Sequence, residues 1–213
     1  MRLLHIDSSI SGEASASRQL SAEIVRALTK ATPGLEVIRR DLHADPLPHI
    51  DNALLPAIRP DPASDPATRP TDEKGAAALD EFLSADIVVI GTPMYNFTVP
   101  TQLKAWIDRI AIAGKTFRYT QAGPQGLAGG KKVIIASSRG GLYAPGMPFE
   151  ANDFQEPYLR AIFRFMGIED IEIVRAEGIA YGPEQREAAI KAALASVHPV
   201  VARVVPERIA MAG

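Results

Sequence analysis

Short runs of apolar residues alternate with amphipathic stretches along most of the chain. Five runs of strand length predict β-strands, over residues 3–7, 35–40, 86–91, 131–138 and 170–177. In the run 86–91 the apolar residues are consecutive and mostly β-branched, which is typical of a strand buried on both faces. We therefore expect this strand at the centre of a sheet.

The amphipathic stretches between these runs predict helices. Apolar residues recur at helical spacing within residues 18–30, and Pro33 ends the pattern. Segment 41–71 is rich in proline and is predicted to be an ordered excursion with at most one short helix, over 52–58. Four more helices are expected, over residues 72–84, 99–113, 156–167 and 184–204.

Strands that alternate with helices at this spacing predict right-handed parallel βαβ units. The whole chain, residues 1–213, is then expected to be one α/β domain, a doubly wound five-stranded parallel sheet with helices on both faces. Such sheets bind ligands outside the carboxyl ends of their strands, where the strand order reverses. Function is therefore to be sought in the loops that follow the strands, at residues 8–17, 93–98 and 138–146.

Composition limits the classes of function. The chain is 46% hydrophobic and 23% charged, as globular proteins are, and its net charge of −2 offers no broad attraction for nucleic acid or an anionic membrane. No apolar window approaches the length of a membrane span. The first residues reach Asp7 after only a few apolar positions, unlike a secretory signal, which predicts a cytoplasmic protein. The chain has no cysteine, so redox chemistry would need a bound cofactor.

Several familiar motifs are missing. Only Gly12 lies in the loop after the first strand, so the GxGxxG fingerprint of dinucleotide binding is absent. Gly114-Lys115-Thr116 imitates the end of a P-loop, but it follows a predicted helix instead of a strand, which favours a helix stop. The four histidines show no metal-binding spacing, and we predict no metal site. No GxSxG elbow indicates a hydrolase.

The three loops at the expected sheet edge carry chemistry that suits a flat, phosphorylated ligand. In the first, serine hydroxyls at a helix N-terminus could hold a phosphate, although Ser15 or Ser17 could be only an N-cap. In the second, a thioether, two aromatic rings and an amide could line a flat ring, or simply pack together. In the third, Gly140 and Gly141 permit positive φ and a close backbone approach to a ligand, or form a plain turn.

Six stretches spread over nearly the whole chain form a specific set. They are Asp7-Ser-Ser-Ile10, Pro93-Met-Tyr-Asn-Phe97, Thr101-Gln-Leu-Lys104, Gly114-Lys-Thr-Phe-Arg-Tyr119, Ser138-Arg-Gly-Gly141 and Ala176-Glu-Gly-Ile-Ala-Tyr-Gly-Pro183. With them the chain resembles the FMN-dependent NADH-azoreductase family, a branch of the flavodoxin-like quinone reductases. The resemblance implies a flavodoxin-like fold and a homodimer with one FMN per subunit near the interface.

The resemblance also implies roles for the loop residues. The phosphate and ribityl chain of FMN would be held by Ser9, Ser15, Ala16 and Ser17. Many members of the family have a glutamine at the position of Ala16. The isoalloxazine ring would lie on Pro93, Met94, Tyr95, Asn96 and Phe97, and its pyrimidine edge on Ser138, Arg139, Gly140 and Gly141. Tyr119 is similar to an aromatic residue of the substrate pocket, and Ile162 stands where some members have an aromatic residue.

The activity that the resemblance implies is two-electron transfer from NADH or NADPH, through FMN, to quinones and aromatic azo compounds. Donor and acceptor would use one pocket in turn, which predicts ping-pong kinetics, and Tyr119 or solvent could supply protons. Two alternatives stay open, a non-catalytic electron carrier of the same fold and a hydrolase. Carriers are usually strongly acidic, so the nearly neutral chain favours an enzyme.

Two predicted helices carry more apolar residues than one sheet face needs. In helix 99–113 they are Val99, Leu103, Trp106, Ile107 and Ile110, and in helix 156–167 they are Tyr158, Leu159, Ile162, Phe163, Phe165 and Met166. If both stripes were exposed, the apolar patch would exceed what monomers tolerate, so we expect a homodimer interface there. The alternative is that segment 41–71 covers these faces within one chain.

Overall fold

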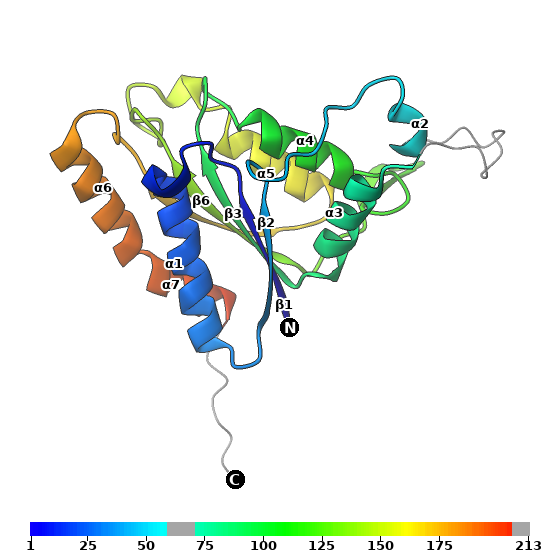
Figure 1. Ribbon diagram of the computed structural model, residues 1–213, viewed down its shortest axis with the longest axis horizontal. Coiled ribbons are helices and arrows are strands. Elements are labelled where there is room, and N and C mark those ends of the chain that lie inside the picture. The colour runs from blue at the N-terminus through cyan, green and yellow to red at the C-terminus, as the bar shows by residue number, and fades with distance from the viewer. Residues whose placement is uncertain (59–70, 206–213) are drawn as a thin grey trace, which may run out of the picture.

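A five-stranded parallel sheet forms the centre of the molecule (Figure 1). The computed structural model describes residues 1–58 and 71–205. The strand order is β2-β1-β3-β6-β7, with bounds Arg2–Asp7 (β1), Glu36–Asp41 (β2), Ile87–Pro93 (β3), Lys132–Ser138 (β6) and Asp170–Ala176 (β7). This order confirms the predicted doubly wound, flavodoxin-like sheet, and β3 lies at its centre with every residue buried.

Helices cover both faces of the sheet. On one face lie α1 (Ala16–Ala31), α6 (Pro183–Ala195) and α7 (Val197–Val204), and on the other α3 (Glu73–Ser84), α4 (Thr101–Ile110) and α5 (Glu156–Phe165). Because successive strand residues point to opposite faces, Leu4 and Val88 pack toward α4, whereas Leu3 and Val89 pack toward α1. In the described part of the chain, no helix is both long enough and apolar enough to cross a membrane.

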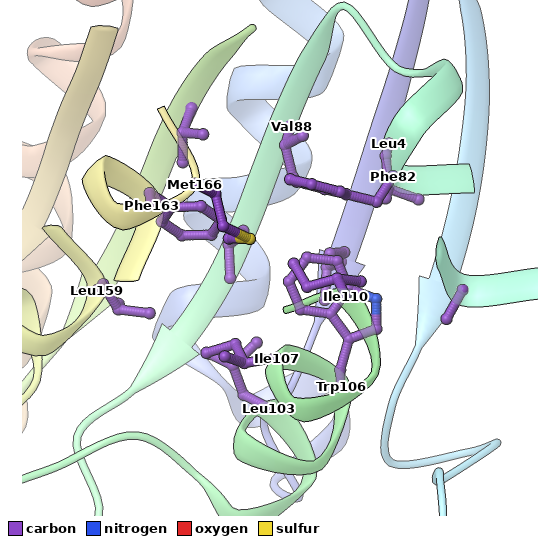
Figure 2. Packing of buried hydrophobic residues seen from close by; sticks show 14 of the residues in the cluster. Leu4, Phe82, Val88, Leu103, Trp106, Ile107, Ile110, Leu159, Phe163 and Met166 are labelled. Atoms are coloured by element: carbon purple, nitrogen blue, oxygen red, sulfur yellow. The ribbon is translucent and has the colours of Figure 1, made fainter. Parts of the chain in front are cut away.

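The apolar stripe of α4 is buried inside the chain. Leu103, Trp106 and Ile110 are fully covered, and the rings of Trp106 and Phe82 meet edge to face at 5.8 Å (Figure 2). The prediction that this stripe forms a subunit surface is therefore wrong for these residues, because the sheet and α3 already cover them. On α5 the structure leaves Tyr158, Ile162 and Phe165 only half-buried.

Two helices differ from their predicted bounds for identifiable reasons. The helix expected over 99–113 ends at Ile110, because the Thr116 hydroxyl donates to the Ile110 carbonyl at 2.6 Å and accepts from the Ile112 N–H at 3.0 Å. The closing helix expected over 184–204 is divided into α6 and α7 at Ser196. Pro199 follows this break and has no N–H with which to continue the α6 ladder.

Three smaller features were missed or misplaced by the sequence pattern. A hairpin of β4 (Phe117–Thr120) and β5 (Gly123–Gly126) had no predicted counterpart, because four-residue strands leave almost no periodicity. Two 3-10 turns, η1 (Gly12–Ala14) and η3 (Glu150–Asn152), were also not predicted. The helix expected over 52–58 is the shorter α2 (Leu55–Ile58), and residues 59–70 of the proline-rich segment lie outside the described chain.

Candidate functional site

The three loops singled out in the sequence meet at one edge of the sheet, around a cavity of about 310 Å³. The cavity lies at the carboxyl ends of β1, β3 and β6, and the strand order reverses between β1 and β3. Eight of the residues proposed for cofactor binding line it, namely Ser9, Ser15, Ala16, Pro93, Met94, Tyr95, Ser138 and Gly140. The predicted convergence of the loops is therefore present in the fold.

Other proposed site residues lie beside this cavity instead of lining it. Ser17 and Arg139 are fully buried behind the loop surface, whereas Phe97 is 45% exposed. Asn96 and Gly141 are also not among the lining residues. Tyr119 stands on the β4–β5 hairpin, 74% exposed, outside the cavity of the single chain.

Serine hydroxyls are concentrated where the first loop enters α1. Ser15 is the N-cap of α1, since its side chain accepts from the Arg18 N–H at 3.3 Å, and it also lines the cavity. Its hydroxyl lies 3.1 Å from that of Ser17. Ser15 therefore caps the helix and also lines the candidate site. The first N–H groups of a helix have no partner within the helix, so this corner favours an anion.

Arg18 is a positioning residue that the sequence reading missed. Its guanidinium donates two hydrogen bonds of 2.7 Å to Asp41 and two more, of 3.2 and 2.8 Å, to the Ser9 carbonyl. The Arg18 hydrogen bonds hold the pKa of Asp41 far below its ordinary value. Burial opposes the charged form of Asp7, but His5, Ser21 and Arg18 together still hold the pKa of that carboxyl below its ordinary value.

These lowered pKa values predict the acid side of the stability profile. In the unfolded chain Asp41 and Asp7 take up protons near the ordinary pKa of about 3.9, whereas in the folded chain they stay ionised at that pH. Their contribution to the free energy of unfolding is therefore complete above about pH 5 and is lost as the pH falls below about 4. Asp41→Asn should lower the free energy of unfolding at neutral pH by about 1–2 kcal/mol, because the pair is bidentate but partly open to water. It should also flatten the loss in acid.

Urea unfolding at about pH 7, 5 and 3.5 measures both effects. Asp45→Asn is the matched control, since Asp45 pairs with Lys74 at the open surface and should contribute almost nothing. Equal losses in the two variants would show that Arg18 and Asp41 form an ordinary surface pair.

The second loop turns sharply beside the cavity. Tyr95 and Thr98 exchange two backbone hydrogen bonds, of 2.9 and 3.1 Å, across a two-residue turn in which Asn96 and Phe97 have φ values of 47° and 71°. Positive φ at both central positions is the pattern of a type I′ turn, and it is unfavourable for phenylalanine. The Met94 N–H donates to the Ser138 carbonyl at 2.8 Å, so this strained turn is tied to the third loop.

The third loop is paired along its length with the segment that follows β7. Backbone bonds join Ile179 to Arg139, Ala180 to Gly140 and Gly178 to Gly141. In the described chain, positive φ occurs at neither Gly140 nor Gly141, so the expectation that they supply left-handed backbone is not met. They instead let two backbone segments run side by side, with Ala180 and Gly140 both facing the cavity.

Five lining residues were not among the proposed site residues, namely Ser11, Ala14, Ile179, Ala180 and Arg186. Ile179 and Ala180 belong to the stretch 176–183, which carried the family resemblance but was given no role. Nothing in the sequence pattern pointed to Arg186, because it lies in a helix that follows the last strand.

Larger hollows, of about 380 to 560 Å³, lie elsewhere on the described surface. One of about 560 Å³ lies between α1 and the edge strand β2, and one of about 450 Å³ lies among α2, α3 and α4. The first is lined by charged side chains that are already paired, such as Arg18 and Arg39 with Asp7. The smaller cavity is the stronger candidate, because it alone lies where the strand order reverses.

Comparison with known proteins finds relatives along almost the whole chain. A family model described as the flavodoxin-like fold matches residues 1–200. A relative from Methylocella silvestris, named FMN-dependent NADH:quinone oxidoreductase, is 58% identical over 194 residues, which cover 91% of this chain and 95% of the relative. FMN-dependent NADH:quinone oxidoreductase 1 from Pseudomonas putida is 58% identical over 198 residues, covering 92% and 96%.

Solved structures with the same architecture carry related names. An FMN-dependent NADH-azoreductase from Bacillus anthracis, solved in complex with FMN, superposes with a TM-score of 0.83 at 26% identity, and covers 96% of this chain and 100% of its own. A second structure, the azoreductase AzrA, has a TM-score of 0.84 at 29% identity, with coverage of 95% and 100%. The likeness to these two structures therefore covers at least 95% of this chain.

Proposed function

This chain belongs to the flavodoxin-like family of FMN-dependent NADH:quinone oxidoreductases, and on that premise we propose that it binds FMN and uses NADH or NADPH to reduce quinones and aromatic azo compounds. One observation in the structure carries the proposal: the loops after β1, β3 and β6 enclose one cavity at the point where the strand order reverses. Ligands of doubly wound sheets bind at this point.

The lining residues fit the parts of FMN. Ser9, Ser15 and the start of α1 offer hydroxyl and backbone donors for a phosphate. Pro93, Met94 and Tyr95 offer an apolar wall for a flat ring, and Ser138 and Gly140 offer polar backbone for its amide edge. When bound, FMN supplies the two-electron redox chemistry that the side chains of this cysteine-free chain do not.

The protein's own part would be to bind and orient. The strained turn at Asn96 and Phe97 holds the second loop against the third, and the paired segment 176–180 holds the third against the sheet. Backbone N–H groups of these loops would stabilise negative charge on the ring edge, as preorganised donors do. An enzyme is favoured over a non-catalytic carrier, because relatives matched over more than nine-tenths of their length bear the names of oxidoreductases.

The proposed activity predicts a yellow protein with about one FMN per chain and ping-pong kinetics, since both substrates would occupy the same cavity in turn. Flavin released by heat should run as FMN on chromatography. NADH oxidation should need no separate reductase and should rise when menadione is added. Double-reciprocal plots at several menadione concentrations should be parallel. A colourless protein that takes up no added FMN would overturn the function, and intersecting plots would overturn the shared cavity.

We also propose that the chain is a homodimer whose interface lies beside the cavity, and that it is cytoplasmic. Support for the dimer comes from aromatic residues left open there: Phe149 and Phe154 are 46% and 58% exposed, and Phe154 is hydrogen-bonded to Phe97 of the second loop. Tyr158, Ile162 and Phe165 of α5 add half-buried apolar surface. A patch of this kind is typical of a protein interface.

Ile162→Glu should weaken the dimer at least about tenfold, because it puts a charge into an apolar contact. Flavin affinity should fall with it if the partner completes the site. Sedimentation velocity and flavin fluorescence on dilution measure the two effects. Val37→Glu, on the edge strand β2 and already 39% exposed, is the control and should change neither. A wild-type chain that is monomeric at micromolar concentration and fully active would refute the dimer.

A further inference from the structure

Arg186 brings a positive charge to an otherwise neutral cavity. Among the described residues that line the cavity, it alone has a charged side chain. It lies in the first turns of α6, and its Nη2 donates a hydrogen bond across to the Ala14 carbonyl, at the end of the first loop. The guanidinium is therefore placed at the same corner as Ser15 and the start of α1.

The charge of Arg186 is not neutralised within the described chain. Its guanidinium has no carboxylate within ion-pair distance in residues 1–58 and 71–205. The other arginines close to these loops are engaged: Arg18 with Asp41, and Arg139 with Asp153 and Glu177. Among the described residues, Arg186 alone has a guanidinium that both reaches the cavity and lacks an acidic partner there.

A phosphate monoester needs more positive charge than the rest of the corner offers. Such a group carries about −1.5 to −2 at neutral pH, whereas a helix N-terminus offers roughly half a positive charge. Serine hydroxyls donate hydrogen bonds but are neutral, and Ala16 presents only a methyl group beside them. A guanidinium matches phosphate oxygens in both charge and geometry.

We propose that Arg186 is a phosphate-binding residue that makes this site prefer FMN to the uncharged riboflavin. The inference rests on the proposed function and goes beyond it by assigning flavin specificity to a residue of α6. The hydrogen bond to the Ala14 carbonyl holds the Arg186 guanidinium at this corner, in the cavity that Ala16 also lines. It takes no part in the redox step.

The test is a comparison of two flavins on the same protein. Flavin is first removed, and circular dichroism checks that the apoprotein is folded. FMN and riboflavin are then titrated separately by fluorescence quenching. Wild type should bind FMN more tightly than riboflavin. Arg186→Gln should weaken FMN binding about 10- to 100-fold, as expected for hydrogen bonds to a charged group, and leave riboflavin binding unchanged. Arg186→Lys keeps the charge and should lose less.

Lys191→Gln is the matched control, because it removes the same charge from the same helix at a position outside the cavity. It should leave the ratio of the two affinities unchanged. A second test uses the wild-type protein alone, so it does not depend on whether a variant folds. The preference for FMN should shrink as the salt concentration rises and as the phosphate becomes singly charged below about pH 6.

The outcomes separate the inference from the function on which it rests. If wild type binds neither flavin, the proposed function fails. If wild type binds FMN but Arg186→Gln weakens both flavins equally, Arg186 only supports the loop at Ala14, and the inference is overturned. An unchanged FMN affinity in Arg186→Gln, or a wild-type preference that is insensitive to salt, overturns it as well.

Discussion

Arg139→Met is expected to lower the free energy of unfolding by about 3–5 kcal/mol, the range for removing one partner of a buried ionic cluster. Arg139 is fully buried, and its guanidinium lies against three carboxylates: 3.0 Å from Asp153, 3.1 Å from Glu177 and in direct contact with Glu156. The Nη2 atom of Arg139 lies close to Asp153 and Glu156 without the geometry of a hydrogen bond, so these contacts are ionic. Without the guanidinium, Arg175 is the one cationic partner left to these three acids among the described residues, and it pairs with Glu156 alone.

The same variant should also lose flavin. The Arg139 carbonyl accepts from Ile179, and Glu177 accepts from the Tyr143 N–H at 2.8 Å, so the cluster holds the third loop against the segment after β7. This places Arg139 beneath the loop as a positioning residue, whereas the sequence reading expected it to contact the cofactor. Contact of its backbone with FMN stays a prediction.

Urea unfolding and flavin content per chain measure the two effects. Arg175→Met is the control, because Arg175 is partly exposed and pairs with Glu156 alone, so its loss should be clearly smaller. A loss under about 1 kcal/mol in Arg139→Met, with full flavin content, would show that the cluster neither stabilises the fold nor holds the loop.

Gly91→Val is expected to destabilise the protein by about 1–3 kcal/mol and to displace the first loop, because it overpacks a filled site. A Cβ at Gly91 would lie 2.8 Å from Asp7 Oδ1, 2.8 Å from Ser21 Oγ and 3.1 Å from the Ser17 carbonyl. Asp7 and Ser21 are buried and hydrogen-bonded to each other at 2.8 Å, so neither can move aside cheaply. The start of α1, which carries Ser15 and Ala16, would have to shift instead.

Gly141→Val is the matched comparison. The three atoms nearest to a Cβ there all belong to the side chain of Tyr143, at 3.1 to 3.3 Å, and this side chain can turn away. We expect Gly141→Val to keep nearly wild-type stability while flavin content falls, and Gly91→Val to lose both. Thermal unfolding and flavin content distinguish the two. Equal stability of the variants would show that α1 does not need the close approach at Gly91.

Most of the fold could be predicted from the sequence, for a local physical reason. Five apolar runs of strand length, separated by amphipathic stretches, leave a parallel sheet as the arrangement that buries them all. Parallel strands joined by helices have their carboxyl ends at one edge, so the loops after β1, β3 and β6 had to meet. Local pattern is less informative at Gly91, where the sequence predicts the end of a strand, whereas β3 continues through it to Pro93.

The sequence by itself therefore determined the layers, the positions of the strands along the chain and the edge that carries the site. Only the tertiary structure decided which side chains do what at that edge. Arg139 and Arg186 are the same type of residue in the sequence. In the fold, acidic side chains neutralise Arg139 beneath a loop, whereas Arg186 contacts Ala14, which is 172 positions away in the sequence. Burial and charge pairing are properties of neighbours in space, and those neighbours exist only once distant strands and helices have packed.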